Sequence, residues 1–236
     1  TSSHETEAVF DKKNETVWFI RDFGDRAEIW NAKRIEPSRH WFDNDNFILS
    51  RFSSTNTNKN RLNISPDGKK LSFCEGTGQL MVTPIAEYKP RQIISSTVFP
   101  NYDWSPDSKW LCVQSKDSND NWDIWIASIN DEQEPYNLSR DPNWDGSPKW
   151  SHDGRIISFL GKRDRTDETD IHYVYLVPDD ERVSNHSEDR TKAINKINLS
   201  RSPKNKSIEE NKKSSLNSNI KKEKEVERVV IDFDNL

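Results

Sequence analysis

The residue types that catalysis uses are present in this chain, but few of them have a useful spacing. A serine nucleophile needs a base within reach and an oxyanion hole. The one Ser-x-x-Lys pair, Ser218 with Lys221, lies in a polar stretch where nothing would desolvate the lysine. The five histidines never form His-Glu-x-x-His, the spacing that places two metal ligands on one helix face. His172, among aromatic residues of a strand pattern, is therefore predicted to be a packed side chain.

Residues 117–123 carry the pattern that comes nearest to a metal site. Their alternating acids and amides resemble the start of a calcium-binding loop. The sixth position, which such a loop reserves for Gly, is Trp122, and the twelfth is Ser128 rather than Glu. These residues are therefore expected to form a polar loop between two strands. The sequence predicts no catalytic, cofactor-binding or metal-ligating residue, and no cofactor.

One short phrase, Ser-Pro-Asp-Gly-Lys in its fullest form, occurs three times and is followed each time by a strand pattern. It occupies residues 65–73, 105–113 and 151–159, so that consecutive copies begin 40 and 46 residues apart. In such a turn Ser and Asp bond to the backbone, Pro sets φ and Gly accepts a positive φ. A repeat of ~40–50 residues is typical of a β-propeller, in which each repeat forms one four-stranded blade.

The repeat also explains three aspartates that resemble a catalytic set. Asp67, Asp107 and Asp153 hold the same position of the phrase, so they are predicted to support turns. Two copies depart from the pattern, since Ser108 replaces the turn Gly and His152 replaces the turn Pro. A positive φ at Ser108 would cost up to ~1 kcal/mol.

The strand that follows each turn alternates in character. In the first copy Leu71 and Phe73 share one face and Ser72 lies on the other. A tryptophan precedes the second and third turns, at Trp104 and Trp150, and is expected to wedge between neighbouring blades. These patterns predict an all-β chain.

Residues 1–180 are predicted to form about four propeller blades. A closed propeller usually needs four to eight blades, and the spacing here suits a larger ring. The chain is therefore expected to hold a partial or incomplete ring. The predicted blades span residues 5–55, 60–96, 99–140 and 144–180.

The character of the chain changes after the last predicted blade. Residues 181–228 have few apolar side chains and many Lys, Asn, Ser and Glu, so they are predicted to be a charged, mostly disordered linker. Residues 190–197 could form a short helix within it. Residues 229–236 regain β character and are predicted to be the first strand of a following domain.

Composition excludes several classes of protein. The 236 residues carry 35 Lys and Arg against 40 Asp and Glu, a net charge of −5, which argues against a nucleic-acid partner. No apolar run approaches the ~20 residues of a membrane span. The two cysteines, Cys74 and Cys112, are predicted to be buried free thiols. No signal peptide is visible, which leaves the compartment open between cytoplasm and periplasm.

Several stretches outside the turn phrase carry a more specific pattern of aromatic and acidic residues. They include Trp18 with the Arg-Asp-Phe-Gly that follows it, the Asp-Ile-Trp of blade three, and the closing Ile-Asp-Phe-Asp. They occupy residues 17–30, 102–107, 123–125, 135–140, 169–176 and 231–234.

In these stretches and in their order the chain resembles the N-terminal propeller of tricorn-type serine peptidases. The turn phrase alone is less specific, since TolB-like and prolyl-oligopeptidase-type propellers share it. The resemblance implies a non-catalytic propeller portion of a tricorn-like serine peptidase. Its partners would be peptides or unfolded polypeptide, which it would gate or channel toward a distant serine active site. The family's second propeller, PDZ-like domain and catalytic core have no counterpart in this sequence.

Two other functions remain open. A stand-alone TolB-like interaction scaffold would use the rim loops at residues 115–122 and 160–169 for partner contacts. A propeller enzyme such as a glycosidase or lactonase would need converging acids or a metal at the axis, and no non-repeating acidic cluster supplies them. In either case an incomplete ring would leave open blade edges through which the chain could associate with itself.

Overall fold

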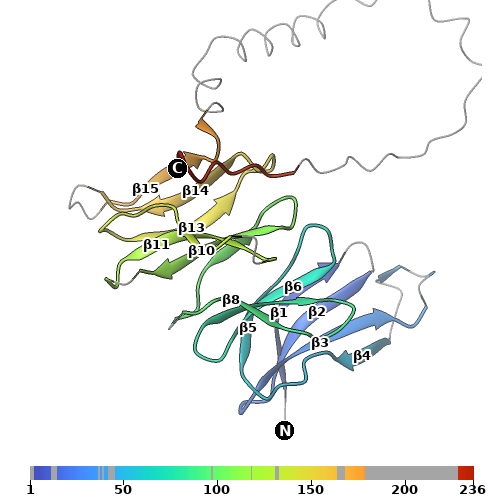
Figure 1. Ribbon diagram of the computed structural model, residues 1–236. Coiled ribbons are helices and arrows are strands. Elements are labelled where there is room, and N and C mark those ends of the chain that lie inside the picture. The colour runs from blue at the N-terminus through green and yellow to red at the C-terminus, as the bar shows by residue number, and fades with distance from the viewer. Residues whose placement is uncertain are drawn as a thin grey trace, which may run out of the picture.

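The computed structural model describes residues 3–178 and 228–236, with short gaps at 12–14, 37, 39, 42–45, 97, 118, 131–132 and 164–167. Fifteen strands are assigned in these ranges, and they form four separate antiparallel sheets. The sheets follow one another along the chain and lie as successive blades of an open arc (Figure 1). The predicted all-β partial propeller is therefore confirmed.

The first two blades each have four strands in sequence order. Blade one holds β1 (His4–Asp11), β2 (Thr16–Asp22), β3 (Ala27–Arg34) and β4 (Phe47–Arg51). Blade two holds β5 (Lys59–Ile64), β6 (Lys70–Glu75), β7 (Gln79–Pro84) and β8 (Arg91–Ile94).

The last two blades repeat this pattern, except that the described part of blade four has three strands. Blade three holds β9 (Tyr102–Trp104), β10 (Trp110–Lys116), β11 (Trp122–Ser128) and β12 (Tyr136–Asn137). Blade four holds β13 (Asp145–Trp150), β14 (Ile156–Gly161) and β15 (Asp170–Tyr175).

Each junction between neighbouring blades buries its own hydrophobic cluster. Because side chains alternate along a strand, every inner blade contributes one face to the cluster before it and the other face to the cluster after it. Blade two, for example, buries Leu71 and Phe73 against blade one and Cys74 and Leu80 against blade three. The same alternation places Cys112 at the junction of blades three and four. Both cysteines are free and buried, as predicted.

The tryptophans before the turns lie between blades, as the repeat predicts. Trp104 is buried, and its indole Nε1 donates a hydrogen bond of 2.8 Å to the hydroxyl of Ser72 in the preceding blade. Trp150 packs against the cluster between blades three and four. The indole thus fills the junction and also fixes the register of one blade against the next.

The repeated turns have the hydrogen bonding that their residues predict. In the first turn Asp67 accepts bonds from the Ser65 hydroxyl at 2.6 Å and from the Lys69 amide at 3.0 Å. Gly68 has a φ of +69°, and Ser108, which replaces the equivalent glycine, has a φ of +60°. The left-handed conformation expected at Ser108 is therefore present.

Residues 228–236, hereafter the C-terminal segment, form no strand. The strand predicted at 229–236 is therefore absent: one backbone hydrogen bond of 2.9 Å, from the Asp232 amide to the Leu176 carbonyl, is not enough to form a ladder, and the segment crosses the ends of blades three and four (Figure 1). Val229 and Phe233 join the hydrophobic cluster between these blades. The rest of the predicted linker, with the short helix at 190–197, lies outside the described residues, and the domain expected to follow stays a prediction.

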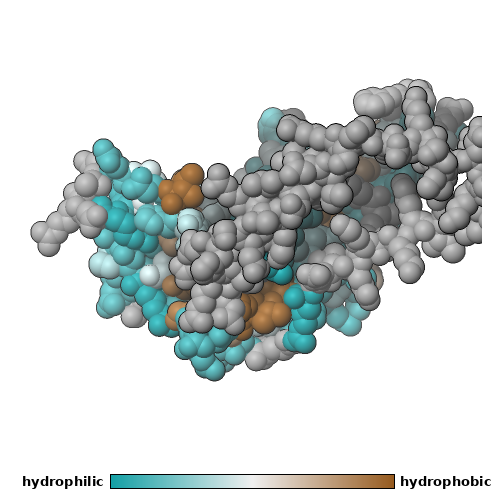
Figure 2. Space-filling view, turned by 90° about the horizontal axis from the view of Figure 1, so that it is seen from above, coloured by the Kyte–Doolittle hydropathy of each residue, from teal (hydrophilic) through white to brown (hydrophobic). Residues whose placement is uncertain are grey.

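The described surface is mostly hydrophilic on the side seen in Figure 2, where hydrophobic residues gather in a few patches. In the described ranges no helix has the length and hydropathy needed to cross a membrane.

Candidate functional site

A groove of about 490 Å³ is formed by the first strands of all four blades. First strands of successive blades surround the axis of a propeller, so this groove lies on the axis side of the arc. Its lining includes both acidic and basic side chains, several amides and exposed backbone. The lining residues are Glu7, Ala8, Val9, Arg61, Leu62, Asn63, Pro100, Asn101, Tyr102, Ser147, Pro148 and Lys149.

Three of the four first strands bulge at the same place. The pairing register shifts after Thr6 in β1, after Asn60 in β5 and after Gly146 in β13. The residue that follows has a positive φ in each case: +52° at Glu7, +53° at Arg61 and +55° at Ser147. A bulge bends its strand and re-aims a side chain, and a left-handed non-Gly residue costs ~1–2 kcal/mol. The fold carries this destabilisation at three residues that line the groove.

The bulge residues connect the first three blades. The carboxylate of Glu7 in blade one accepts a hydrogen bond of 2.9 Å from the backbone amide of Leu62 in blade two. The guanidinium of Arg61 in blade two donates to the side-chain oxygen of Asn101 in blade three. The bulges at Glu7 and Arg61 therefore each present a side chain to the next blade along the arc.

The same line of contacts continues from blade three to blade four. The amide nitrogen of Asn101 donates to Gln114 Oε1 at 3.0 Å, and the Ser147 backbone amide lies 3.4 Å from the same oxygen. Two residues further along each strand, the ammonium of Lys149 pairs with the carboxylate of Asp103 at 3.3 Å. Polar contacts thus cross every junction of the arc on the side of the groove.

The surroundings of the groove raise the pKa values of two groups, Tyr102 and Cys74. Burial raises the pKa of the Tyr102 phenol above its ordinary range, so this hydroxyl stays neutral and donates to the backbone carbonyl of Arg61. Burial also raises the pKa of the Cys74 thiol to about 12; the positive charge of Arg61 opposes this rise, and the negative charge of Glu7 adds to it. Neither group supplies a nucleophile at neutral pH, because both hold their protons.

The groove therefore offers hydrogen-bond donors and acceptors rather than reactive groups. In the part of the chain that the structure describes, no three His, Cys, Asp or Glu side chains come together as metal ligands. The arrangement is suited to binding an extended polar chain, whose own backbone can exchange hydrogen bonds with amides and charged side chains.

The residues that the sequence singled out lie elsewhere. Asp67, Asp107 and Asp153 each sit in their own turn, and their role there is confirmed by the hydrogen bonds that they accept. The bond from the Ser151 hydroxyl lowers the pKa of Asp153, despite some burial.

The predicted polar loop at residues 117–123 is also confirmed. Asp117 accepts bonds of 2.8 Å from the backbone amides of Asn119 and Asn121, which closes the connection between β10 and β11. His172 stacks on Phe159 with ring centroids 5.7 Å apart, as expected for a packed side chain. Ser218 and Lys221 lie outside the described residues.

Sequence reasoning missed the residues that line the groove. Arg61, Asn101 and Ser147 each stand four positions before the serine of a repeated turn. That fixed offset was available in the sequence, but the three residue types differ and so formed no motif. The contacts in the structure relate these positions: Arg61 donates to Asn101, and Asn101 and Ser147 both approach the Gln114 side-chain oxygen.

Comparison with known proteins supports the fold and goes no further. No family model matches the chain, and no curated protein matches it. Among solved structures, the tricorn protease matches with a TM-score of 0.58 and 12% identity, over 74% of this chain and 18% of that chain. TolB from Acinetobacter baumannii matches with a TM-score of 0.52 and 13% identity, over 73% of this chain and 41% of the other.

A third solved structure, the β-propeller domain of the Trilobed protease from Pyrococcus furiosus, has an open velcro topology. It matches with a TM-score of 0.50 and 16% identity, over 73% of this chain and 55% of that chain. In all three cases the match covers less than two thirds of the other chain.

The sheets, turns and neighbours together define an open β-propeller arc. Its fold is that of the TolB-like and tricorn-type propellers, as the sequence predicted.

Proposed function

We propose that this chain is the non-catalytic propeller portion of a tricorn-like serine peptidase, and that its axial groove gates peptides or unfolded polypeptide on their way to proteolysis. The observation that carries the proposal is the groove itself, which takes lining residues from the first strand of all four blades. The tricorn protease among the solved neighbours adds to its plausibility through the shared fold.

The proposed mechanism depends on the shape of the groove and on its polar side chains. An extended segment can lie along the groove and exchange backbone hydrogen bonds with Asn63, Asn101 and the exposed strand backbone. Arg61 and Lys149 attract acidic side chains of the segment, and Glu7 attracts basic ones, so the groove accepts mixed sequences. A folded domain has its backbone groups already paired, so it cannot make these backbone hydrogen bonds. The chain selects for an unfolded substrate without cleaving it.

Binding of labelled unstructured peptides, followed by fluorescence polarisation, tests this function. The double variant Arg61→Ala with Lys149→Ala should weaken binding of an acidic peptide at least ~10-fold, since charge-assisted hydrogen bonds are each worth ~1.5–3 kcal/mol when desolvated. Lys69→Ala, which removes an exposed lysine in a turn away from the groove, is the matched control. Equal binding by all three proteins, or equal binding of a folded protein, would contradict the proposal.

A stand-alone TolB-like interaction scaffold is the second candidate. It is favoured by the ordered loop around Asp117, which holds Trp122 beneath the ammonium of Lys116 at 5.6 Å on the rim of blade three. Such a scaffold would bind folded partners through this loop. Trp122→Ala would then abolish binding, whereas the groove variants would not.

A further inference from the structure

The C-terminal segment has the features of a bound peptide rather than those of a strand. It crosses the ends of blades three and four without joining either sheet (Figure 1). Its side chains nevertheless alternate: Val229 is buried, Val230 is 63% exposed, and Ile231 packs against the cluster between the two blades. Such alternation is typical of an extended chain. The surface beneath the segment, hereafter the docking surface, consists of Pro106, Asp107, Trp110, Tyr136, Gly154 and Leu176.

A glycine in the turn of blade four makes room for the start of the segment. At the junction of blades two and three the equivalent residue is Ser108, whose hydroxyl accepts a hydrogen bond from the Asp67 amide of the preceding turn. At the junction of blades three and four this position is Gly154, which has no side chain to reach across. Val229 lies over it instead, since a Cβ on Gly154 would come within 2.6 Å of Val229 Cγ2. The segment thus fills a space that a turn side chain occupies at the previous junction.

The docking surface also binds the backbone of the segment. Asp107 Oδ2 accepts a hydrogen bond of 3.0 Å from the Val229 amide. The other oxygen of this carboxylate, Oδ1, accepts the bonds within its own turn. Three residues further along the segment, the Asp232 amide donates to the Leu176 carbonyl at 2.9 Å. These two bonds fix the register of an extended peptide without requiring particular side chains.

An aromatic contact holds the other end of the segment. The ring of Phe233 packs against Trp110 and Tyr136, with ring centroids 5.6 and 5.3 Å apart. The Tyr136 hydroxyl also donates to the Leu236 carbonyl at 2.7 Å. Together with the apolar side chains two and four residues before it, Phe233 gives the bound segment the pattern apolar-x-apolar-x-aromatic.

The start of the segment does not fill the space beside it. A hollow of about 300 Å³ lies there, lined by Asp153, Arg155 and Val177 of blade four and by Arg228 and Val230 of the segment. In the described ranges no ladder joins the segment to a sheet. A segment with few buried contacts and no ladder opens locally, without unfolding of the elements beneath it.

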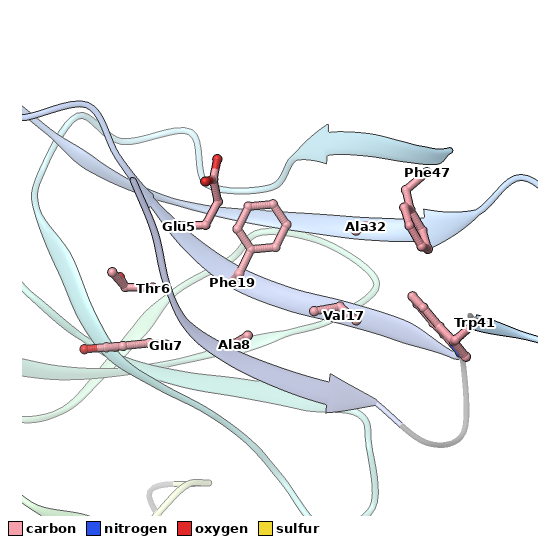
Figure 3. Close-up of a pocket in the computed structure, with 9 residues that line it drawn as sticks. All are labelled: Glu5, Thr6, Glu7, Ala8, Val17, Phe19, Ala32, Trp41 and Phe47. Atoms are coloured by element: carbon pink, nitrogen blue, oxygen red, sulfur yellow. The ribbon is translucent and has the colours of Figure 1, made fainter. Parts of the chain in front are cut away.

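The apolar hollow of blade one differs from the docking surface. Figure 3 shows Phe19 and Val17 on its middle strand, with Trp41 and Phe47 together at one end. Its volume is about 400 Å³, but no described segment lies in it. That hollow therefore gives no pattern for a ligand, whereas the docking surface has a segment bound to it.

We propose that the docking surface is a peptide-recognition site, separate from the axial groove, and that the C-terminal segment is its ligand in cis. The site binds linear segments with the pattern apolar-x-apolar-x-aromatic in an extended conformation. The segment of the same chain covers the site until it opens, and a peptide of the same pattern then binds in trans. Binding at this site does not use Arg61 or Lys149, so it can fail independently of peptide gating at the axial groove.

Fluorescence polarisation with a labelled synthetic peptide of residues 228–236 tests the proposal on the full chain. Phe233→Ala weakens the ligand in cis, so this variant should bind the peptide ~10-fold more tightly than the unaltered chain does, since one aromatic ring loses its contacts with two others. A peptide with Ala in place of its Phe should bind ~10-fold more weakly for the same reason. A peptide of the same composition in scrambled order controls for binding without sequence preference.

Two further substitutions in the Phe233→Ala background show whether the peptide lies on the docking surface. Gly154→Ala places a methyl group where Val229 lies, and it should weaken binding of the peptide ~10-fold. Gly24→Ala is the matched control, because Gly24 also has a positive φ, +89°, but has nothing within 4 Å. The control should leave binding unchanged.

Hydrogen exchange of the unaltered chain does not depend on how the variants fold. The amides of Val229 and Asp232 should be less protected than those of β10 and β11, and excess peptide should speed their exchange by displacing the segment. Equal protection of the segment and these strands would overturn the proposal, as would a Phe233→Ala variant that binds no more tightly than the unaltered chain. Equal binding of the scrambled peptide, or equal binding with Gly154→Ala and Gly24→Ala, would overturn it as well.

Discussion

Ser108 combines a strained backbone with a contact between blades. Its φ of +60° is one that glycine adopts freely, while its buried hydroxyl accepts a hydrogen bond of 3.0 Å from the backbone amide of Asp67 in the preceding blade. The residue therefore gives up conformational stability, about 1 kcal/mol, and satisfies a donor in the neighbouring turn. The substitution of serine for the repeat's glycine has a structural reason that the turn alone does not reveal.

Substitution at Ser108 should separate these two effects. Ser108→Gly relieves the backbone but leaves the Asp67 amide without its acceptor, at a cost of ~1–3 kcal/mol. Ser108→Ala loses the bond and keeps the strain. We expect the free energy of unfolding in urea to fall in the order unaltered chain, Ser108→Gly, Ser108→Ala, with about 1 kcal/mol between the two variants. A Ser108→Gly protein more stable than the unaltered chain would show that the bond between blades contributes little.

The buried thiols predict how stability depends on pH. Burial raises the folded pKa of Cys74 to about 12, and that of Cys112 well above its ordinary value. The unfolded thiols ionise near pH ~8.5, so the folded state binds more protons above that pH. The stability associated with each thiol is complete below pH ~8.5 and is lost as the pH rises toward the folded pKa.

Urea unfolding at pH 8 and pH 10 measures this loss. The decrease between the two pH values should be smaller in a protein with Cys74→Ala and Cys112→Ala than in the unaltered chain. Both thiols should also resist a thiol reagent at pH 8 until urea unfolds the protein. Equal pH dependence in the two proteins, or rapid labelling without urea, would show that the thiols are accessible in the folded state.

At the scale of elements, the C-terminal segment connects the turns of two blades. The Val229 amide donates to Asp107 Oδ2 at 3.0 Å, and its side chain covers Gly154 in the next turn. Phe233 lies against Trp110 and Tyr136, with ring centroids 5.6 and 5.3 Å apart. The aspartate of one repeated turn thus uses its second oxygen to hold a segment more than a hundred residues away in sequence.

Glycine-to-alanine substitutions test how closely this segment packs. Gly154 has a φ of +73°, and a Cβ there would lie 2.6 Å from Val229 Cγ2. Gly24 has a φ of +89° with nothing within 4 Å, so Gly24→Ala measures the backbone cost alone, about 1 kcal/mol. We expect Gly154→Ala to lower the free energy of unfolding by more than this. The excess should shrink in a Val229→Ala background, and an equal cost at both glycines would mean that the segment moves aside freely.

The sequence predicted elements that repeat and missed features that depend on tertiary contacts. The turn aspartates, the alternation of Leu71, Ser72 and Phe73, and the hairpin loop at 117–123 all follow from local chemistry, and all were predicted. Residues 229–236 have the composition of a strand, but in the described structure their backbone pairs with the backbone of a neighbouring blade through only one hydrogen bond, from the Asp232 amide to the Leu176 carbonyl after β15, and their apolar side chains pack across two turns instead. The bulge residues Glu7, Arg61 and Ser147 are of three different types, so they form no motif in the sequence.

At the scale of the whole molecule, the arc is a chain of nearest-neighbour junctions. Each blade contacts the next through one cluster, so stability is approximately a sum of blade and junction terms, as in repeat proteins. The free faces at the two ends contribute no such term. The contribution of a repeated position to the free energy of unfolding therefore depends on whether its face of the blade is covered, and not on its residue type.

Two equivalent positions measure that difference directly. Leu80 and Ile171 hold the same place on the trailing faces of blades two and four, at 0% and 74% exposure. Leu80→Ala should lower the free energy of unfolding by ~2–5 kcal/mol, because it opens a cavity in a packed cluster. Ile171→Ala should cost less than ~0.5 kcal/mol, because this face is exposed. A large cost for Ile171→Ala would mean that another part of the chain covers this face in solution.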